Sequence, residues 1–153
     1  MHYYIASDHA GFRFKQKLKM HLKQWHDFED LGVHSDERSD YPKIAIALAK
    51  KVAKDKGSLG ILICGTGVGM SIVANKFPGA RAAVIHDGFT AKMARQHNNA
   101  NIACLGARET TEQTLFLLAK TFLETKFLGH EKGEERHLKR VKQIEEIDRE
   151  HFK

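Results

Sequence analysis

An apolar run followed by a glycine-rich loop constrains the fold of this chain more than any other segment. Residues 59–63 are apolar apart from one glycine, which is typical of a strand buried on both faces of a parallel sheet. The loop that follows reads Cys64-Gly65-Thr66-Gly67-Val68-Gly69, and residues 70–75 then predict the start of a helix. A buried strand that leads through glycines into a helix indicates an alternating α/β fold.

The glycine loop also has the composition of an anion-binding turn. Its glycines let the backbone turn sharply and approach a ligand closely. Successive N–H groups at a helix N-terminus attract negative charge, and the same position stabilises the thiolate form of Cys64. Taken alone, Cys64 at the end of a strand favours a small buried hydrophobic side chain, but the glycines after it favour a functional role.

The remainder of the chain alternates strand and helix patterns. Further strands are predicted over residues 3–7, 27–31, 82–85 and 102–105, and helices over 12–25, 44–53, 88–96, 111–123 and 134–150. Strands separated by helices require right-handed crossovers, which predicts a parallel sheet covered on both faces. No linker, repeat or low-complexity tract interrupts the pattern, so residues 1–153 are predicted to form a single domain.

Composition and charge limit the classes of partner. The chain has 153 residues and a formal net charge of +6. Much of the charge lies on basic residues interleaved with apolar ones at helical spacing, namely Arg13, Lys15, Lys17, Lys19 and Lys23. This spacing predicts the solvated face of an amphipathic helix rather than a nucleic-acid surface. The histidines at positions 21, 26, 34, 130 and 151 are likewise predicted to lie at the surface, without forming a metal site.

Targeting and redox patterns point to a cytoplasmic protein. No run approaches the ~20 apolar residues of a membrane span, and the N-terminus lacks the pattern of a secretory signal. The chain has two cysteines, which favours reduced thiols over a disulfide scaffold. Cys104 lies in a strand-like run without following glycines and is predicted to belong to the core.

Four short segments follow the predicted strands at their carboxyl ends, where ligands bind in sheets of this class. They are Ser7-Asp8-His9, residues 64–69, His86-Asp87 and Gly106-Ala107-Arg108. We expect these segments to lie along one edge of the sheet.

A set of motifs is similar to one enzyme family. The motifs are residues 7–12 (SDHAGF), Asp40-Tyr41-Pro42, residues 64–69, Ala74-Asn75-Lys76, Arg95-Gln96-His97-Asn98, and Arg136-His137 with Arg140. In order and spacing they resemble the type B ribose-5-phosphate isomerases, a family that includes galactose- and allose-6-phosphate isomerases. The resemblance extends from the first strand to the last helix.

The resemblance implies a flavodoxin-like, Rossmann-like, three-layer α/β/α fold. It implies five parallel strands in the order 2-1-3-4-5 and a C-terminal helix that packs on a partner subunit. It also implies a homodimer or a dimer of dimers with shared active sites, acting on a phosphorylated sugar without a cofactor or metal. The expected reaction interconverts ribose 5-phosphate and ribulose 5-phosphate through an enediolate. A hexose 6-phosphate of the allose or galactose type is the alternative substrate.

The resemblance also implies a role for individual residues. Cys64 is the base, and the backbone N–H groups of Gly65, Thr66, Gly67, Val68 and Gly69 hold the enediolate oxygen. Thr66 and His97 assist ring opening, while Asp8, His9 and Asn98 bind the sugar. Arg108, Arg136 and Arg140 contact the phosphate, some of them from the neighbouring subunit. One branch of the family uses a carboxylate a few residues after the cysteine, but Met70 stands at that position here.

Other interpretations of these residues remain open on the sequence alone. His97 is compatible with a helix C-terminus, His9 with a helix cap, and Arg136 and Arg140 with a solvated surface. Gly65-Thr66-Gly67 with Asp87 is also compatible with a dinucleotide-binding turn, although Met70 stands where that fingerprint has its third glycine. The final helix could close its own domain or cross a subunit boundary.

Overall fold

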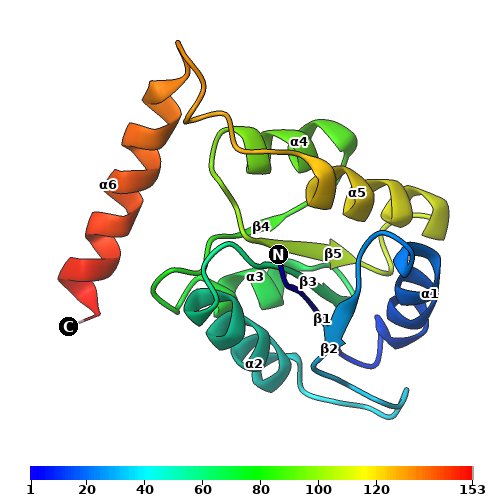
Figure 1. The fold of residues 1–153 in the computed structure, drawn as a ribbon. Helices are drawn as coiled ribbons and strands as arrows, with labels where there is room; N and C mark the ends of the chain where they lie inside the picture. Colours follow the sequence, from blue (N-terminus) through cyan, green and yellow to red (C-terminus); the bar gives the residue numbers. More distant parts are fainter. Residues whose placement is uncertain (153) are drawn as a thin grey trace.

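The computed structural model describes residues 1–152 as a five-stranded parallel sheet between two helical layers (Figure 1). The strands are β1 (Tyr3–Ser7), β2 (Phe28–Asp30), β3 (Leu59–Cys64), β4 (Ala82–Val84) and β5 (Ile102–Gly106). The helices are α1 (Phe12–Leu22), α2 (Tyr41–Lys54), α3 (Val68–Ala74), α4 (Gly88–Gln96), α5 (Glu112–Glu124) and α6 (Glu135–His151). The predicted fold class, with helices on both faces of a parallel sheet, is confirmed.

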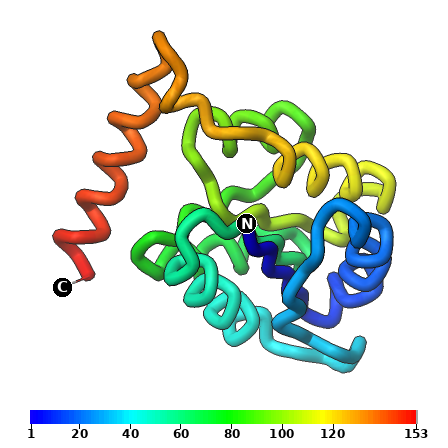
Figure 2. The backbone as a smooth tube through the Cα atoms, viewed as in Figure 1, coloured from blue at the N-terminus to red at the C-terminus, as the bar shows by residue number. Residues whose placement is uncertain are grey.

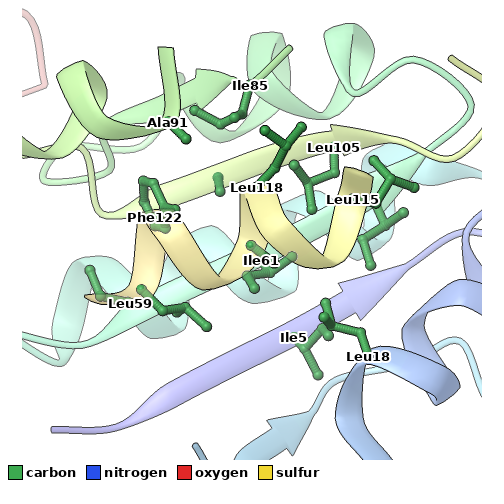
Figure 3. Close-up of a cluster of buried hydrophobic side chains, with 14 of the residues drawn as sticks. Ile5, Leu18, Leu59, Ile61, Ile85, Ala91, Leu105, Leu115, Leu118 and Phe122 are labelled. Carbon is green, nitrogen blue, oxygen red and sulfur yellow. The ribbon is translucent and has the colours of Figure 1, made fainter. Parts of the chain in front are cut away.

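Alternating side chains of the strands form two separate cores. Ile61 and Ile63 of β3 face the layer of α1, α4 and α5, where Phe122 is fully buried (Figure 3). Leu62 and Cys64 face the opposite layer of α2 and α3. Because side chains alternate along a strand, the apolar run of β3 supplies both cores at once.

The strand order is β2-β1-β3-β5-β4, so the expected order 2-1-3-4-5 is wrong in the position of the last two strands. β5 pairs with β3 from Gly60↔Ile102 to Cys64↔Gly106 and is buried along its whole length. β4 has only three residues, all partly exposed, and occupies the edge. A short, partly exposed strand suits an edge, whereas a central strand must be apolar on both faces.

Lys15 departs from the predicted solvated helix face. Its side chain is completely buried, and Nζ donates to Asp30 Oδ1 and to the Val33 carbonyl oxygen, each at 2.6 Å. Burial lowers the pKa of Lys15, while the hydrogen bond to Asp30 opposes that shift. The helical spacing placed this lysine on a polar face, but the loop after β2 covers that part of α1. His26 is another exception, because the protein buries it rather than exposing it.

Helix α6 projects away from the sheet and its two layers (Figure 2). Val141 is buried, but Ile147 on the same apolar stripe is 54% exposed. The Gly79 N–H donates to Asp148 Oδ2 at 2.8 Å, which fixes α6 to the turn before β4. Its packing on a partner subunit stays a prediction.

Candidate active site

The glycine loop lies against the end of the neighbouring strand. Gly67 has a φ of +78°, and a Cβ atom at this position would lie 3.0 Å from the backbone of Cys104. The Ala107 N–H donates to the Cys64 carbonyl oxygen at 2.8 Å, and the Arg108 N–H donates to that of Gly65 at 3.1 Å. Only glycine combines this backbone conformation with such a close approach, so the loop is fixed by the fold itself.

The thiol of Cys64 lies under this loop. Cys64 is 5% exposed, and the Gly67 N–H donates to its sulfur at 3.0 Å. A hydrogen bond donated to sulfur stabilises a thiolate more than a thiol, as does the adjacent N-terminus of α3. The arrangement therefore places the Cys64 sulfur beside the backbone donors of a helix N-terminus.

Cys104 provides an internal contrast to Cys64. It lies fully buried in β5, on the same face of the sheet as Cys64. Burial, with Cys64 nearby, raises the pKa of the Cys104 thiol far above its ordinary value. The prediction that Cys104 belongs to the core is confirmed, and it remains a neutral thiol at physiological pH.

Asp8 and His9 lie beside β3, at the end of β1. The Asp8 N–H donates to the Ile63 carbonyl oxygen, and Asp8 Oδ1 accepts from the N–H groups of Ala10 and Gly11. The Asp8 side chain thus holds the turn that leads into α1, while the N–H of Phe12, the first residue of α1, donates to the His9 carbonyl oxygen. The Ser39 N–H donates to His9 Nδ1 at 3.3 Å, so the neutral imidazole carries its proton on Nε2.

Two further side chains lie over the glycine loop. The Arg108 guanidinium would be 3.4 Å from a Cβ atom at Gly65, which places a cation beside the loop. The Tyr41 ring would be 2.6 Å from a Cβ atom at Gly69, so a side chain at that position would displace it. No role was predicted for Tyr41, although it belongs to the motif Asp40-Tyr41-Pro42, which could have indicated one. Thr66 is exposed on the loop, and its hydroxyl accepts from the Val68 N–H at 3.3 Å.

A second group of predicted site residues lies at the amino edge of the sheet, where the strands begin. The first group lies at the carboxyl edge, where the strands end. His97 ends α4, and its ring stacks on that of His137 from α6, with centroids 4.1 Å apart and planes 7° from parallel. Asn98 follows and is exposed. Arg136 Nη2 lies 2.9 Å from Glu134 Oε2, and its Nη1 donates to the Gly133 carbonyl oxygen. Arg140 is exposed one turn further along α6.

His137 is the least satisfied polar side chain of this second group. It is buried, and within residues 1–152 neither ring nitrogen has a hydrogen-bond partner. Glu134 Oε2 lies 3.1 Å from Nε2 without forming a hydrogen bond. Burial lowers the pKa of His137, and the neighbouring His97 and Arg136 lower it further. His137 is therefore neutral at pH 7.

The two groups of residues do not meet within one chain. Cys64 ends β3, whereas the segment after α4 approaches the start of that strand, where the Gly60 N–H donates to the Asn101 carbonyl oxygen. The residues from Gly60 to Cys64 alone span about 13 Å. The structure thus brings together Asp8, His9, residues 64–69 and Arg108, and separately His97, Asn98, Arg136 and Arg140.

Residues 3–144 match the family model described as Ribose/Galactose Isomerase. The chain belongs to this isomerase family. It is 42% identical over 149 residues to the probable ribose-5-phosphate isomerase B of Mycoplasma pneumoniae, covering 96% of this chain and 95% of that protein. The solved type B ribose 5-phosphate isomerase of Trypanosoma cruzi is 40% identical, with a TM-score of 0.90 over 99% of this chain and 100% of that chain.

A structure from Mycoplasma genitalium adds a bound ligand to the comparison. That ribose-5-phosphate isomerase B was solved with bound ribulose 5-phosphate, is 40% identical to this isomerase, and has a TM-score of 0.90 over 97% of each chain. Within residues 1–152 of this isomerase, every helix is too short or too polar to cross a membrane. The same residues contain no group of three or more His, Cys, Asp or Glu side chains placed to hold a metal ion.

Proposed function

We propose that this isomerase interconverts ribose 5-phosphate and ribulose 5-phosphate, with Cys64 as the base. The hydrogen bond from the Gly67 N–H to the Cys64 sulfur carries this proposal, because it supports a thiolate at the N-terminus of α3. The substrate class follows the relatives named for ribose 5-phosphate and the Mycoplasma genitalium complex with ribulose 5-phosphate.

In the proposed mechanism, the Cys64 thiolate removes the proton from C2 of the open-chain aldose. The electron pair forms a double bond between C1 and C2, and the carbonyl oxygen O1 takes the negative charge and then a proton. The thiol returns its proton to C1, while the O2 hydroxyl loses its proton and becomes the carbonyl. The reaction is balanced without an external oxidant or reductant.

The backbone of the glycine loop supplies donors for the charge that develops on the sugar. The first N–H groups of a helix have no intrahelical acceptor, and in α3 these include that of Gly69. Donors fixed before the reaction stabilise an enediolate without reorganisation. Because the Gly67 N–H donates to the sulfur and the Val68 N–H donates to the Thr66 hydroxyl, the N–H groups of Gly65, Thr66 and Gly69 are proposed to hold the oxygen.

We further propose that a homodimer, or a dimer of dimers, forms each site from two chains. One chain supplies Cys64 and the residues at the same carboxyl edge of the sheet, namely Asp8, His9, Thr66 and Arg108. The partner supplies the second group from its amino edge. His97 and Thr66 then assist ring opening, Asn98 binds the sugar, and Arg136 and Arg140 bind the phosphate with Arg108. Support comes from the distance between the two edges and from α6, which projects from the domain (Figure 1).

An exchange experiment tests the chemistry and the substrate together. Ribose 5-phosphate incubated with the protein in D₂O should give ribulose 5-phosphate and take up deuterium at the exchanged carbon, as seen by NMR, with a chelator present. Retention of all carbon-bound hydrogen would mean that the thiol returns its proton before it exchanges with solvent, whereas failure to form ribulose 5-phosphate would contradict the proposal. Comparing kcat/KM for ribose, allose and galactose phosphates separates the pentose proposal from the hexose alternative, and a higher value for either hexose would overturn it.

A further inference from the structure

A basic cavity lies at the amino edge of the sheet, among residues that the proposed reaction does not use. It has a volume of about 330 Å³ and is bounded by the end of α2, the start of β3 and the segment between α4 and β5. Its polar lining includes Lys56, Ser58, Arg81, Arg95, Asn99 and Glu145. The length of β3 sets this cavity about 17 Å from Cys64.

Within residues 1–152, Arg95 is a buried cation without an anionic partner. It is 8% exposed, and its Nε and Nη1 donate to three neutral oxygens: the carbonyls of Thr125 and Ala100 and the side chain of Asn99. Burial, together with the positive charge of Arg81, lowers the pKa of Arg95 to about 10. A buried charge that has only neutral partners is costly, so the local field favours an anion.

Asn99 holds both guanidinium groups beside the cavity. Its side-chain oxygen accepts from Arg95 at 3.0 Å, and its carbonyl oxygen accepts from Arg81 Nε at 3.0 Å. Its φ is +46°, a left-handed conformation that asparagine tolerates better than most residues. Glu145, the one carboxylate of the lining, is 3.6 Å from Arg81 Nη1 and 44% exposed. Three cations therefore line the space against the exposed Glu145, and Asp148, outside the lining, also acts on Arg81.

Ser58 is the second observation that points to a ligand. Its side chain is buried at the start of β3 and lines the cavity. Within residues 1–152 its hydroxyl oxygen has no hydrogen-bond partner. Buried hydroxyls almost always have a partner, because an unsatisfied one loses its hydration without compensation. Rotation of the Ser58 side chain towards the cavity would let a ligand oxygen supply the missing partner.

We propose that this cavity is a second anion site, which binds the phosphate group of free phosphate or of a small phosphomonoester. Arg81, Arg95 and Lys56 supply the positive charge, and the Ser58 hydroxyl donates to a phosphate oxygen. Three cations and a hydroxyl suit the charge and the several acceptor oxygens of a phosphate. Binding there would also order the segment that carries His97 and Asn98; only this consequence rests on the proposed function.

The test measures binding by calorimetry, independently of turnover. The Arg108→Ala/Arg136→Ala/Arg140→Ala background removes the three arginines assigned to the substrate phosphate. Inorganic phosphate and glycerol 3-phosphate are titrated in parallel at constant ionic strength, which distinguishes free phosphate from a phosphomonoester. We expect one ligand bound per chain. Lys56→Gln should raise Kd about threefold and Ser58→Ala about fivefold, while Lys54→Gln, a matched exposed lysine outside the cavity, should change it little.

Two results would overturn the proposal. One is the absence of binding heat for both ligands in the folded background; the other is an equal change in Kd for Lys56→Gln, Ser58→Ala and Lys54→Gln. If the triple background does not fold, the rise in Tm caused by phosphate is measured in the natural chain. The rise in Tm caused by phosphate must then be smaller in Lys56→Gln and Ser58→Ala than in Lys54→Gln. A protein without isomerase activity would still bind phosphate here, so the two proposals fail independently.

Discussion

The two edges of the sheet hold their candidate site residues in different ways. At the carboxyl edge, Cys64, Asp8 and His9 are fixed by hydrogen bonds from neighbouring loops. At the amino edge, Asn98 and Arg140 are exposed, and the histidine stack depends on a helix that projects from the domain. The first edge is organised within one chain, whereas the second leaves its residues exposed, as the proposed contact with another chain requires.

The largest expected effect distinguishes Cys64 at the carboxyl edge from Cys104 in the middle of β5. Cys64→Ala should lower kcat at least about 10³-fold, because it removes the only base assigned to the reaction. Cys104→Ala should leave kcat within about twofold, and its cost should appear in stability as a small cavity of about 1 kcal/mol. Kinetics and urea unfolding of both variants check this. Equal loss of kcat in two folded variants would remove the distinction.

Mixing two inactive variants tests whether the edges of different chains meet. The Cys64→Ala variant keeps Arg136 and Arg140 of α6, and the Arg136→Ala/Arg140→Ala variant keeps the proposed base. After joint unfolding and refolding, about half of the dimers should be mixed, and one of the two sites in each mixed dimer receives neither defect. Roughly a quarter of the wild-type activity should therefore return.

The control for this experiment is refolding of each variant alone, which should restore nothing. Mass spectrometry under native conditions must show the mixed dimers. If mixed dimers form and activity stays at the level of the single variants, base and phosphate-binding arginines come from the same chain.

A single arginine of the amino edge should affect binding more than chemistry. Arg140→Ala removes a charge-assisted contact worth about 1.5–3 kcal/mol, so KM for ribose 5-phosphate should rise roughly 10- to 100-fold. Unphosphorylated ribose should lose much less. Lys139→Ala, a neighbouring exposed cation on α6, is the matched control. An equal loss for both substrates would remove Arg140 from the phosphate site.

The sequence predicted most elements because their patterns are local. Strand β1 and helix α4 have the predicted bounds. The first helix ends at Leu22 rather than at residue 25, because Trp25 continued the apolar spacing although it is exposed in the structure. The strand order, which the resemblance implied, was wrong, and the predicted strands 82–85 and 102–105 were too alike in length to distinguish the edge strand from the central one.

The division of the site was predictable in part. A helix between parallel strands must run back to the amino edge, so the end of α4, with His97, had to lie far from Cys64. The buried side chains of Lys15 and His137 were not predictable in this way. Their burial depends on Asp30 and Val33 in one case and on the stack with His97 in the other, which are contacts between distant segments.

The smallest expected effect is the pH dependence of stability that the amino edge introduces. The lowered pKa of His137 means that the unfolded chain binds its proton more readily than the folded one. The His137 contribution to stability is therefore present above the ordinary histidine pKa of about 6.5 and is lost as the pH falls below it. Burial lowers the pKa of His26 as well, so His26 adds a contribution of the same sign.

Urea unfolding between pH 7.5 and 5 measures this effect in single variants. His137→Gln should reduce the loss of stability at low pH while leaving the contribution of His26, and His34→Gln, at an exposed histidine, should leave the whole dependence unchanged. Cys64→Ala should also leave it unchanged, because the effect belongs to the other edge of the sheet. If His137→Gln behaves like His34→Gln, the stacked histidine gains no proton on unfolding. The amino edge would then differ from the carboxyl edge only in exposure, and not in its response to pH.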